Sequence, residues 1–324
     1  MAKILGIGNA LVDLLIETES DDILKELNLP KGSMQLVDND TKKLIAEKSN
    51  ELTKSMASGG SAANTVHGVA RLGTESAFIG TIGDDEIGRF FSDDLKKSNI
   101  KPFLKMGVNP SGLASTLISK DGERTFGTFL GAAIELNASG LNEEDFKGYD
   151  ILHMEGYLVQ NHELVEEALS MANKNGLKVS LDLASYNVVE DNLDFLQDMI
   201  LKYVDIVFAN EEEAKAFTGL EPEEALEEIA SMVEIAVVKV GKDGSFIKSG
   251  DEVVKIGVID TDVVDTTGAG DLYAAGFLHG YVNNKDFEYS GKLGALLAGT
   301  VISKIGAKIS ADDWETIKEK LASY

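Results

Sequence analysis

The sequence predicts an α/β fold in which helices flank a central, mostly parallel sheet. From residue 150 onward, short apolar segments rich in Val and Ile alternate with longer amphipathic segments. Apolar segments with so few polar residues are typical of parallel strands that are covered on both faces. The expected strands span 151–154, 177–182 and 204–209, and the expected helices span 163–175 and 193–203.

The composition fits one large domain over residues 1–324, since 44% of the residues are hydrophobic. The chain has no cysteine, which excludes disulfides and thiolate metal sites. Its formal net charge of −25 argues against partners such as nucleic acids or anionic membranes, so we expect a small-molecule substrate. We expect a cytoplasmic protein, because no signal peptide is evident and no apolar run is long enough to span a bilayer.

A glycine-rich turn at 265–271, with the sequence Asp-Thr-Thr-Gly-Ala-Gly-Asp, leads into an apolar helical pattern. The free N–H groups and the dipole of such a helix N-terminus attract an anion to one point. Asp271 lies in the first turn of this helix. Its carboxylate can cap the helix, or it can take a proton from a hydroxyl that attacks a bound phosphoryl group. Acidic residues at both ends of the run favour the second interpretation.

The segment 265–271, with Ala275 and Gly276 behind it, resembles the C-terminal signature of the ribokinase-like (PfkB) carbohydrate and nucleoside kinases. The resemblance implies a ribokinase-like fold with a small β-sheet lid, and a reaction that uses ATP and Mg²⁺. It also implies that Thr266 contacts the nucleotide and that Asp265 helps to hold a monovalent cation such as K⁺. The catalytic residues that it implies are Asp271, the base, and Gly268, Ala269 and Gly270, whose N–H groups stabilise the transferred phosphoryl group.

A second glycine-rich segment spans 58–65. Gly59 and Gly60 allow a close approach of the backbone, and Ser61 can cap the helix that follows. The segment resembles the N-terminal signature of the same family, which implies that Gly59, Gly60 and Asn64 bind substrate hydroxyls. A simple glycine-rich helix cap is the alternative.

The segment 4–13 predicts a buried strand that ends in a tight turn. Gly6 and Gly8 are compatible with a dinucleotide-binding fingerprint, but Leu11 stands where the third glycine is needed. In the ribokinase-like family the first strand ends in an Asp that binds two substrate hydroxyls, and Asp13 matches it. A carboxylate suits this task because it accepts two hydrogen bonds. From the local sequence alone, Asp13 is equally well a turn residue.

Asn210 and Glu213 follow the expected strand 204–209. They lie three positions apart, so a helix that begins here places them on one face. The spacing resembles the Asn-x-x-Glu motif of the family, which implies that both residues organise Mg²⁺, largely through water, and that Asn210 also binds the nucleotide. A capped helix with an acidic first turn is the alternative, and these residues alone favour it.

The segment 235–246 predicts two strands joined by a glycine turn. By resemblance, Gly241 and Gly244 of this turn lie beside the nucleotide. Many relatives carry Thr near Lys239, so Lys239 or Lys242 can supply charge to the phosphates instead. The alternative is that both are surface lysines. The sequence contains no Gly-x-x-x-x-Gly-Lys-Ser/Thr motif, which excludes a P-loop.

Alternating segments at about 14–38 and 103–129 interrupt the regular strand–helix pattern. In the ribokinase-like family such segments form the lid over the substrate, and an ordinary edge hairpin is the alternative. Four apolar lid residues can line a pocket for a nucleobase or form the core of the lid itself. These residues are Met34, Leu36, Phe126 and Phe129.

The resemblance covers nearly the full chain, and the segments 8–13 and 124–132 are most similar to the adenosine-kinase-like branch. We therefore expect an ATP-dependent kinase that phosphorylates a primary hydroxyl of an adenosine-like nucleoside. One alternative is a sugar kinase that acts on ribose, fructose or 2-keto-3-deoxygluconate. Another is a non-catalytic relative that binds a nucleoside or sugar. A monomer and a homodimer are both compatible with the sequence.

Overall fold

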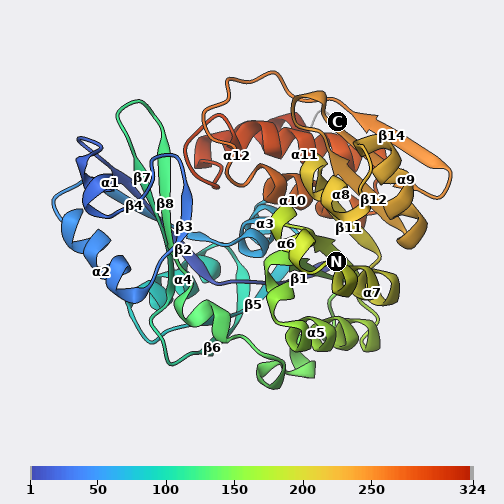
Figure 1. The fold of residues 1–324 in the computed structure, drawn as a ribbon. Coiled ribbons are helices and arrows are strands. Elements are labelled where there is room, and N and C mark those ends of the chain that lie inside the picture. Colours follow the sequence, from blue (N-terminus) through green and yellow to red (C-terminus); the bar gives the residue numbers. More distant parts are fainter. Residues whose placement is uncertain (1, 322–324) are drawn as a thin grey trace.

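The computed structural model describes residues 2–321, whose strands form two sheets (Figure 1). The larger sheet has nine strands in the order β14-β13-β12-β11-β10-β9-β1-β5-β6. Its pairings are parallel from β12 to β6, and β13 and β14 add an antiparallel edge. This arrangement confirms the predicted α/β fold. The strands are β1 (Lys3–Ile7), β5 (Glu75–Ile82), β6 (Ile100–Met106), β9 (Ile151–Glu155), β10 (Lys178–Asp182), β11 (Ile206–Asn210), β12 (Ile235–Lys239), β13 (Ser245–Ser249) and β14 (Glu252–Ile256).

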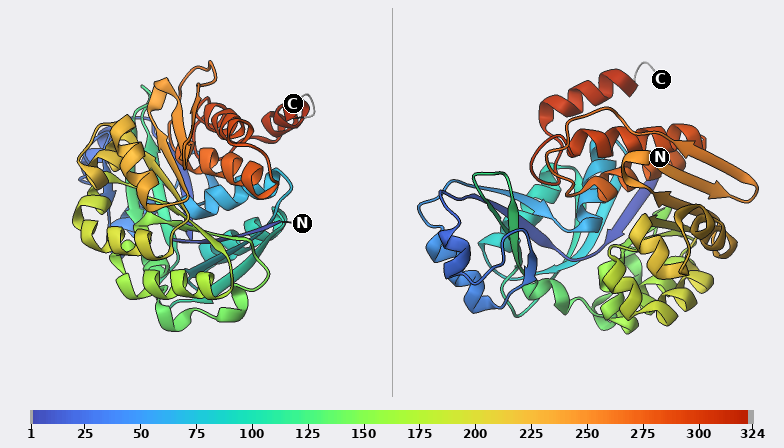
Figure 2. Two further views of the ribbon diagram at one scale, coloured as in Figure 1. Left: turned by 90° about the vertical axis from the view of Figure 1, so that its right-hand side faces the viewer. Right: turned by 45° about the horizontal axis from the view of Figure 1, so that its top comes forward.

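Helices cover both faces of the large sheet (Figure 2). Successive strand residues point to opposite faces, so Ile206 and Phe208 of β11 pack in one core and Val207 and Ala209 in the other. No helix within residues 2–321 is long and apolar enough to cross a membrane. The face with Ile206 and Phe208 carries α3 (Ser61–Arg71), α10 (Ala269–Val282), α11 (Phe287–Val301) and α12 (Ala311–Leu321), with α4 (Glu86–Lys97) beside α3. The face with Val207 and Ala209 carries α5 (His162–Lys174), α6 (Tyr186–Asp191), α7 (Leu193–Tyr203), α8 (Glu211–Thr218) and α9 (Pro222–Met232).

The smaller sheet stands to one side of the large sheet in Figure 1 and has the strand order β3-β8-β7-β2-β4. Buried apolar residues such as Ile16, Ile45 and Leu117 join this sheet to its two helices. The elements are β2 (Leu11–Glu17), β3 (Met34–Leu36), β4 (Lys54–Gly59), β7 (Gly112–Ile118) and β8 (Arg124–Phe129), with α1 (Asp22–Glu26) and α2 (Asn39–Lys48).

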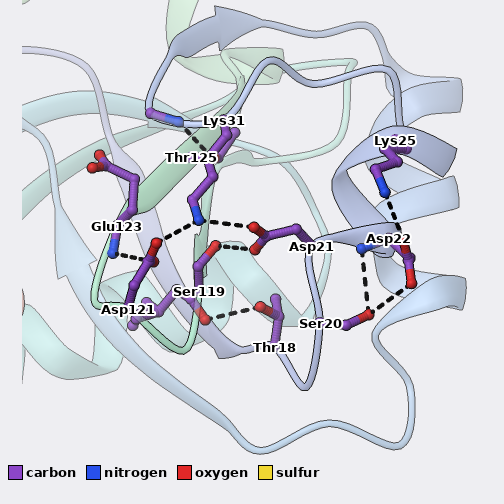
Figure 3. Close-up of polar contacts among 12 residues, drawn as sticks. Thr18, Ser20, Asp21, Asp22, Lys25, Lys31, Ser119, Asp121, Glu123 and Thr125 are labelled. Carbon is purple, nitrogen blue, oxygen red and sulfur yellow. Dashed lines mark hydrogen bonds and ion pairs between the residues drawn. The ribbon is translucent and has the colours of Figure 1, made fainter.

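A polar network ties the outer end of this sheet together (Figure 3). The Lys31 ammonium lies 2.8 Å from Asp21 Oδ2 and 2.6 Å from Asp121 Oδ2. Ser119 donates a hydrogen bond to Asp21 Oδ1 at 2.6 Å. The turn between β7 and β8 is therefore held against the chain that precedes α1.

The structure divides the single strand expected at 4–13. The chain leaves the large sheet after Ile7 and enters the small sheet at Leu11, so β1 and β2 pair with different partners. The prediction of one strand with a terminal turn was wrong because two apolar segments with a short gap look continuous in sequence. Both expected lid segments contribute strands to the small sheet, but the start of the second, 103–106, lies in β6 of the large sheet. The strand β4 was not expected.

Candidate active site

The candidate active site lies where β10, β11 and β12 end and where α10 begins. Ligands of open α/β sheets bind at the carboxyl ends of the strands. A cavity of about 870 Å³ occupies this position, and the glycine-rich turn forms part of its wall. Asp13 and Phe126 of the small sheet line it as well, so the two sheets meet at this cavity.

The glycine-rich turn presents free N–H groups at the start of α10. Gly268 is left-handed, with a φ of 76°, and a Cβ at this position would lie only 2.7 Å from a side chain of the loop after α11. A residue with a side chain therefore does not fit. Within residues 2–321, the N–H groups of Gly268 and Gly270 have no acceptor, whereas the Ala269 N–H donates to the Thr266 carbonyl at 3.2 Å. The free N–H groups and the helix dipole can bind an anion here.

Asp271 is held by the first turn of α3. Its Oδ1 accepts a hydrogen bond from Ser61 Oγ at 2.7 Å, and its Oδ2 accepts one from Asn64 Nδ2 at 2.9 Å. These bonds fix the orientation of the carboxylate. The two glycine-rich segments, far apart in the sequence, therefore build one site.

Ser61 does not cap α3 as expected. Gly60 occupies the N-cap position with a φ of 93°, and a side chain there would collide with the Asn9 carbonyl oxygen. Ser61 is consequently the first residue of the helix, and its hydroxyl bonds to Asp271 instead. Only glycine tolerates the backbone conformation that this cap requires.

Burial raises the pKa of Asp271 above its usual range, because a buried carboxylate is poorly solvated. Hydrogen bonds from Asn64 and Ser61 oppose this shift, and the charge of Asp182 adds to it. A carboxylate with a raised pKa takes up a proton more readily than an ordinary Asp. The alternative role, capping of α10, has no side-chain hydrogen bond in its support among the described residues.

Asp13 lies in the middle of β2, beside Gly59 of β4. Any Cβ on Gly59 would collide with the Asp13 carboxylate, so glycine leaves the room that this side chain needs. Burial raises the pKa of Asp13 to about 6, although the positive charge of Lys308 opposes the shift. Asp13, Gly60 and Asn64 all line the same cavity. The structure thus brings three of the four residues expected to bind substrate to one cavity, and the fourth, Gly59, lies beside Asp13.

Glu155, at the end of β9, is a buried carboxylate of the site that the sequence analysis missed. It accepts hydrogen bonds from the Asn9 N–H at 2.9 Å, from Asn9 Nδ2 at 2.6 Å and from the Ala62 N–H at 2.9 Å. Burial raises the pKa of Glu155 to about 7 in spite of these donors. The sequence feature that could have identified Glu155 is its position directly after the apolar segment 151–154, at the end of a strand.

Asn210 and Glu213 form a capping box at the start of α8. Asn210 Oδ1 accepts from the Glu213 N–H at 2.8 Å, and Glu213 Oε2 accepts from the Asn210 N–H at 2.8 Å. The capping interpretation is therefore correct. Both residues also line the cavity, so the cap does not exclude a role toward a ligand. Burial, helped by the charge of Asp182, raises the pKa of Glu213 to about 7.

The glycine turn after β12 also lines the cavity. Gly241 and Gly244 have φ values of 53° and 95°, which favour glycine. Lys242 is exposed but also lines this cavity, so both interpretations stay open for it. Lys239 is different, because its side chain is mostly buried and its ammonium forms an ion pair with Asp182 at 3.1 Å. The surface alternative does not apply to Lys239.

Asp265 connects the turn before α10 to the small sheet. Its carboxylate accepts hydrogen bonds from the Thr267 and Gly306 N–H groups, both at 2.7 Å, and forms an ion pair with Arg124 of β8. Arg124 Nη1 also donates to Thr267 Oγ1 at 3.0 Å. Thr266 lines the cavity beside them.

A second cavity of about 890 Å³ adjoins the small sheet. Gly60 and Ser61 line both cavities, so the two meet at the start of α3, next to Asp271. Apolar residues such as Leu130 and Leu136 form much of the wall of the second cavity.

The four residues expected around a base do not share one pocket. Met34 and Leu36 line the second cavity, and Phe126 lines the first. Phe129 lines neither cavity, and the Lys42 ammonium lies 4.8 Å from the centre of its ring. Phe126 and Phe129 are an odd number of positions apart in β8, so they point to opposite faces of the strand.

An anion-binding helix start, with a buried carboxylate at the junction of two cavities, is suited to kinases that phosphorylate an alcohol group of a small molecule. Comparison with known proteins agrees, because the model of the pfkB family of carbohydrate kinases matches residues 32–314. The chain belongs to this family, which confirms the resemblance.

The most similar proteins include nucleoside and sugar kinases. The solved structure of an adenosine kinase from Sinorhizobium meliloti has a TM-score of 0.86, with 34% identity and 99% of each chain covered. That of a probable sugar kinase from Rhizobium etli CFN 42 has a TM-score of 0.87, with 33% identity and 98% of each chain covered. An uncharacterized sugar kinase from Archaeoglobus fulgidus is 32% identical over 251 residues, which cover 74% of this chain and 96% of that protein.

Proposed function

We propose that this protein transfers the γ-phosphoryl group of ATP to a primary hydroxyl of an adenosine-like nucleoside. The position of Asp271 carries the proposal. Its carboxylate lies at the start of α10, near the free N–H groups of Gly268 and Gly270, and is bonded to Ser61 at the junction of the two cavities. The first cavity then holds the nucleotide and the reacting hydroxyl of the acceptor, and the rest of the acceptor extends into the second cavity.

In the proposed step, Asp271 takes the proton of the acceptor hydroxyl as the hydroxyl oxygen bonds to the γ-phosphorus. The bond from the γ-phosphorus to the β–γ bridging oxygen breaks, and ADP leaves. The N–H groups of Gly268 and Gly270 stabilise the charge on the transferred group, aided by the dipole of α10. The raised pKa of Asp271 favours the proton transfer.

Asp13 and Asn64 orient the acceptor in this proposal. Asn64 Oδ1 is buried and has no hydrogen-bond partner within residues 2–321. Because buried acceptors are normally paired, this oxygen fits a substrate hydroxyl. The Asp13 carboxylate adds two oxygens that can accept hydrogen bonds in the same cavity.

Mg²⁺ fits the oxygen-rich wall that Asn210, Glu213 and Asp182 form. Hard cations prefer such oxygens, and Mg²⁺ usually keeps several water ligands. The described residues contain no group of three or more His, Cys, Asp or Glu side chains that could hold a metal directly. Binding through water and the nucleotide phosphates agrees with this. When bound, the ion would neutralise negative charge on the phosphates.

A monovalent cation at Asp265 stays a prediction of the resemblance. This carboxylate already receives two N–H donors and the Arg124 guanidinium, so a cation would compete with them. Turnover in K⁺ buffer is compared with turnover in choline buffer. Activation by K⁺ would support the cation, and equal rates would remove it from the account.

The apolar wall of the second cavity favours a nucleoside over a free sugar, because a base offers apolar surface to bury. The adenosine kinase from Sinorhizobium meliloti supports this choice. The sugar-kinase relatives support the alternative acceptors ribose, fructose and 2-keto-3-deoxygluconate.

The test is ADP release by the purified protein with Mg²⁺ and ATP. Adenosine, inosine, cytidine, ribose, fructose and 2-keto-3-deoxygluconate are offered separately, and mass spectrometry identifies the phosphorylated product. We expect turnover with adenosine or a related nucleoside. Turnover only with a free sugar would overturn the acceptor. Binding of these compounds without any turnover would favour a non-catalytic protein.

A further inference from the structure

Lys239 is the last residue of β12 and lies directly opposite Asn210 of β11. Its side chain is 15% exposed, and its ammonium forms an ion pair with Asp182 Oδ2 at 3.1 Å. Asp182 itself is 8% exposed and ends β10. A lysine in such a place is unusual, because burial of an ammonium is costly unless it serves an acceptor.

The Lys239 ammonium also reaches the start of α10. It lies 3.0 Å from the point that a Cβ on Gly270 would occupy. Lys239 lines the cavity together with Gly270 and Asp271. The cation therefore stands beside the free N–H group that the proposed function assigns to the phosphoryl group.

The charges around Lys239 keep it protonated. Burial lowers its pKa, but the charges of Asp182 and Glu213 outweigh burial and raise the pKa above the usual lysine value. An ammonium has three N–H donors, and within residues 2–321 only Asp182 accepts a hydrogen bond from it. Two donors remain available to a ligand.

We propose that Lys239 binds the phosphoryl group that is transferred, next to the N–H group of Gly270. This inference rests on the proposed function. Charge on the transferred group is spread over its non-bridging oxygens, and a fixed cation in a buried site stabilises that charge. Lys239 then acts beside Asp271 and independently of how the acceptor is recognised.

The competing explanation is that Lys239 only neutralises Asp182. The two explanations differ in which nucleotide binds more weakly when the cation is removed. A lysine that contacts the γ-phosphoryl group matters for ATP and not for ADP, whereas a purely structural lysine affects both nucleotides alike.

The experiment measures binding of ADP and of the non-hydrolysable ATP analogue β,γ-imido ATP by calorimetry, with Mg²⁺. The variants are Lys239→Met, Lys239→Arg and the double variant Asp182→Asn/Lys239→Met, which removes both charges of the ion pair. For both Met variants we expect binding of the analogue to weaken about 10- to 100-fold, as for loss of a hydrogen bond to a charged group, with ADP binding little changed. Lys239→Arg keeps a positive charge, so we expect its binding of the analogue to weaken less.

Equal loss for the two nucleotides, or full recovery in the double variant, would overturn the assignment. If Lys239→Met does not fold, the double variant gives the same comparison. The measurement needs no acceptor, so it decides on Lys239 even if the wild-type protein phosphorylates none of the acceptors tested. In that case the acceptor assignment fails, and the nucleotide result stands separately.

Discussion

Asp13 illustrates how a single carboxylate in this site depends on its surroundings. Burial raises its pKa to about 6, and Lys308 opposes the shift with an ammonium that is itself buried without a hydrogen-bond partner among the described residues. The charged form of Asp13, which we propose to accept hydrogen bonds from substrate hydroxyls, is therefore lost as the pH falls through about 6. An ordinary Asp would keep its charge down to about pH 4.

We expect the KM for the acceptor to rise as the pH falls from 7 to 5, because Asp13 loses its charge in this range. Asp13→Asn should raise the acceptor KM at pH 7 by about 10- to 100-fold, through loss of hydrogen bonds to a charged group. The variant should also lose the acid dependence of this KM. Steady-state kinetics across this pH range provide the test. An unchanged KM in the variant would exclude Asp13 from acceptor binding.

At the scale of elements, one ion pair attaches the small sheet to the glycine-rich turn at 265–271. Arg124 of β8 is 19% exposed and Asp265 is 2% exposed, so the pair is largely buried. Arg124→Met should lower the free energy of unfolding by about 1–3 kcal/mol, because the Asp265 charge loses a partner.

Arg89→Met is the matched control for Arg124→Met. Its ion pair with Asp84 is 3.3 Å long and the Arg89 side chain is 63% exposed, so we expect a change of at most about 0.5 kcal/mol. Urea unfolding measures both variants. Equal effects of the two substitutions would contradict the role assigned to the buried pair.

The close contact between α10 and α11 depends on small residues. A Cβ on Gly276 of α10 would lie 2.6 Å from backbone atoms of Leu293 and Gly294 in α11. Gly276→Ala should therefore destabilise the protein by about 1–3 kcal/mol through overpacking. At Gly140 a Cβ would meet only one atom, at 3.7 Å, so Gly140→Ala should stay within about 0.5 kcal/mol. Thermal unfolding of both variants decides, and a neutral Gly276→Ala would contradict this packing argument.

For the molecule as a whole, the parts with a repeating pattern or a dense motif could be predicted from sequence. Strands buried on both faces are apolar throughout, so the large sheet was evident from residue 150 onward. The turn at 265–271 was evident because a helix start that binds an anion requires glycines in fixed places. The order of the residues alone identified both.

The remaining features depend on contacts between distant parts of the chain. The hydrogen bond from Ser61 to Asp271 joins two helices, and no local sequence pattern predicts it. The strand β4 is recognisable only beside β2, with which it pairs. In the sequence, Glu155 looks like any residue at the end of a strand. Only the folded structure brings the N–H groups of Asn9 and Ala62 to its carboxylate.

The central claim is that Asp271 is the base of a phosphoryl transfer, and Asp271→Asn tests it most directly. The amide has nearly the same shape, and its oxygen can keep one of the two side-chain hydrogen bonds, but it cannot accept the proton. We expect turnover with the best acceptor to fall by about 100- to 10,000-fold. Calorimetry should show nearly unchanged binding of acceptor and of β,γ-imido ATP. Turnover close to that of the wild-type protein, with binding intact, would contradict the account.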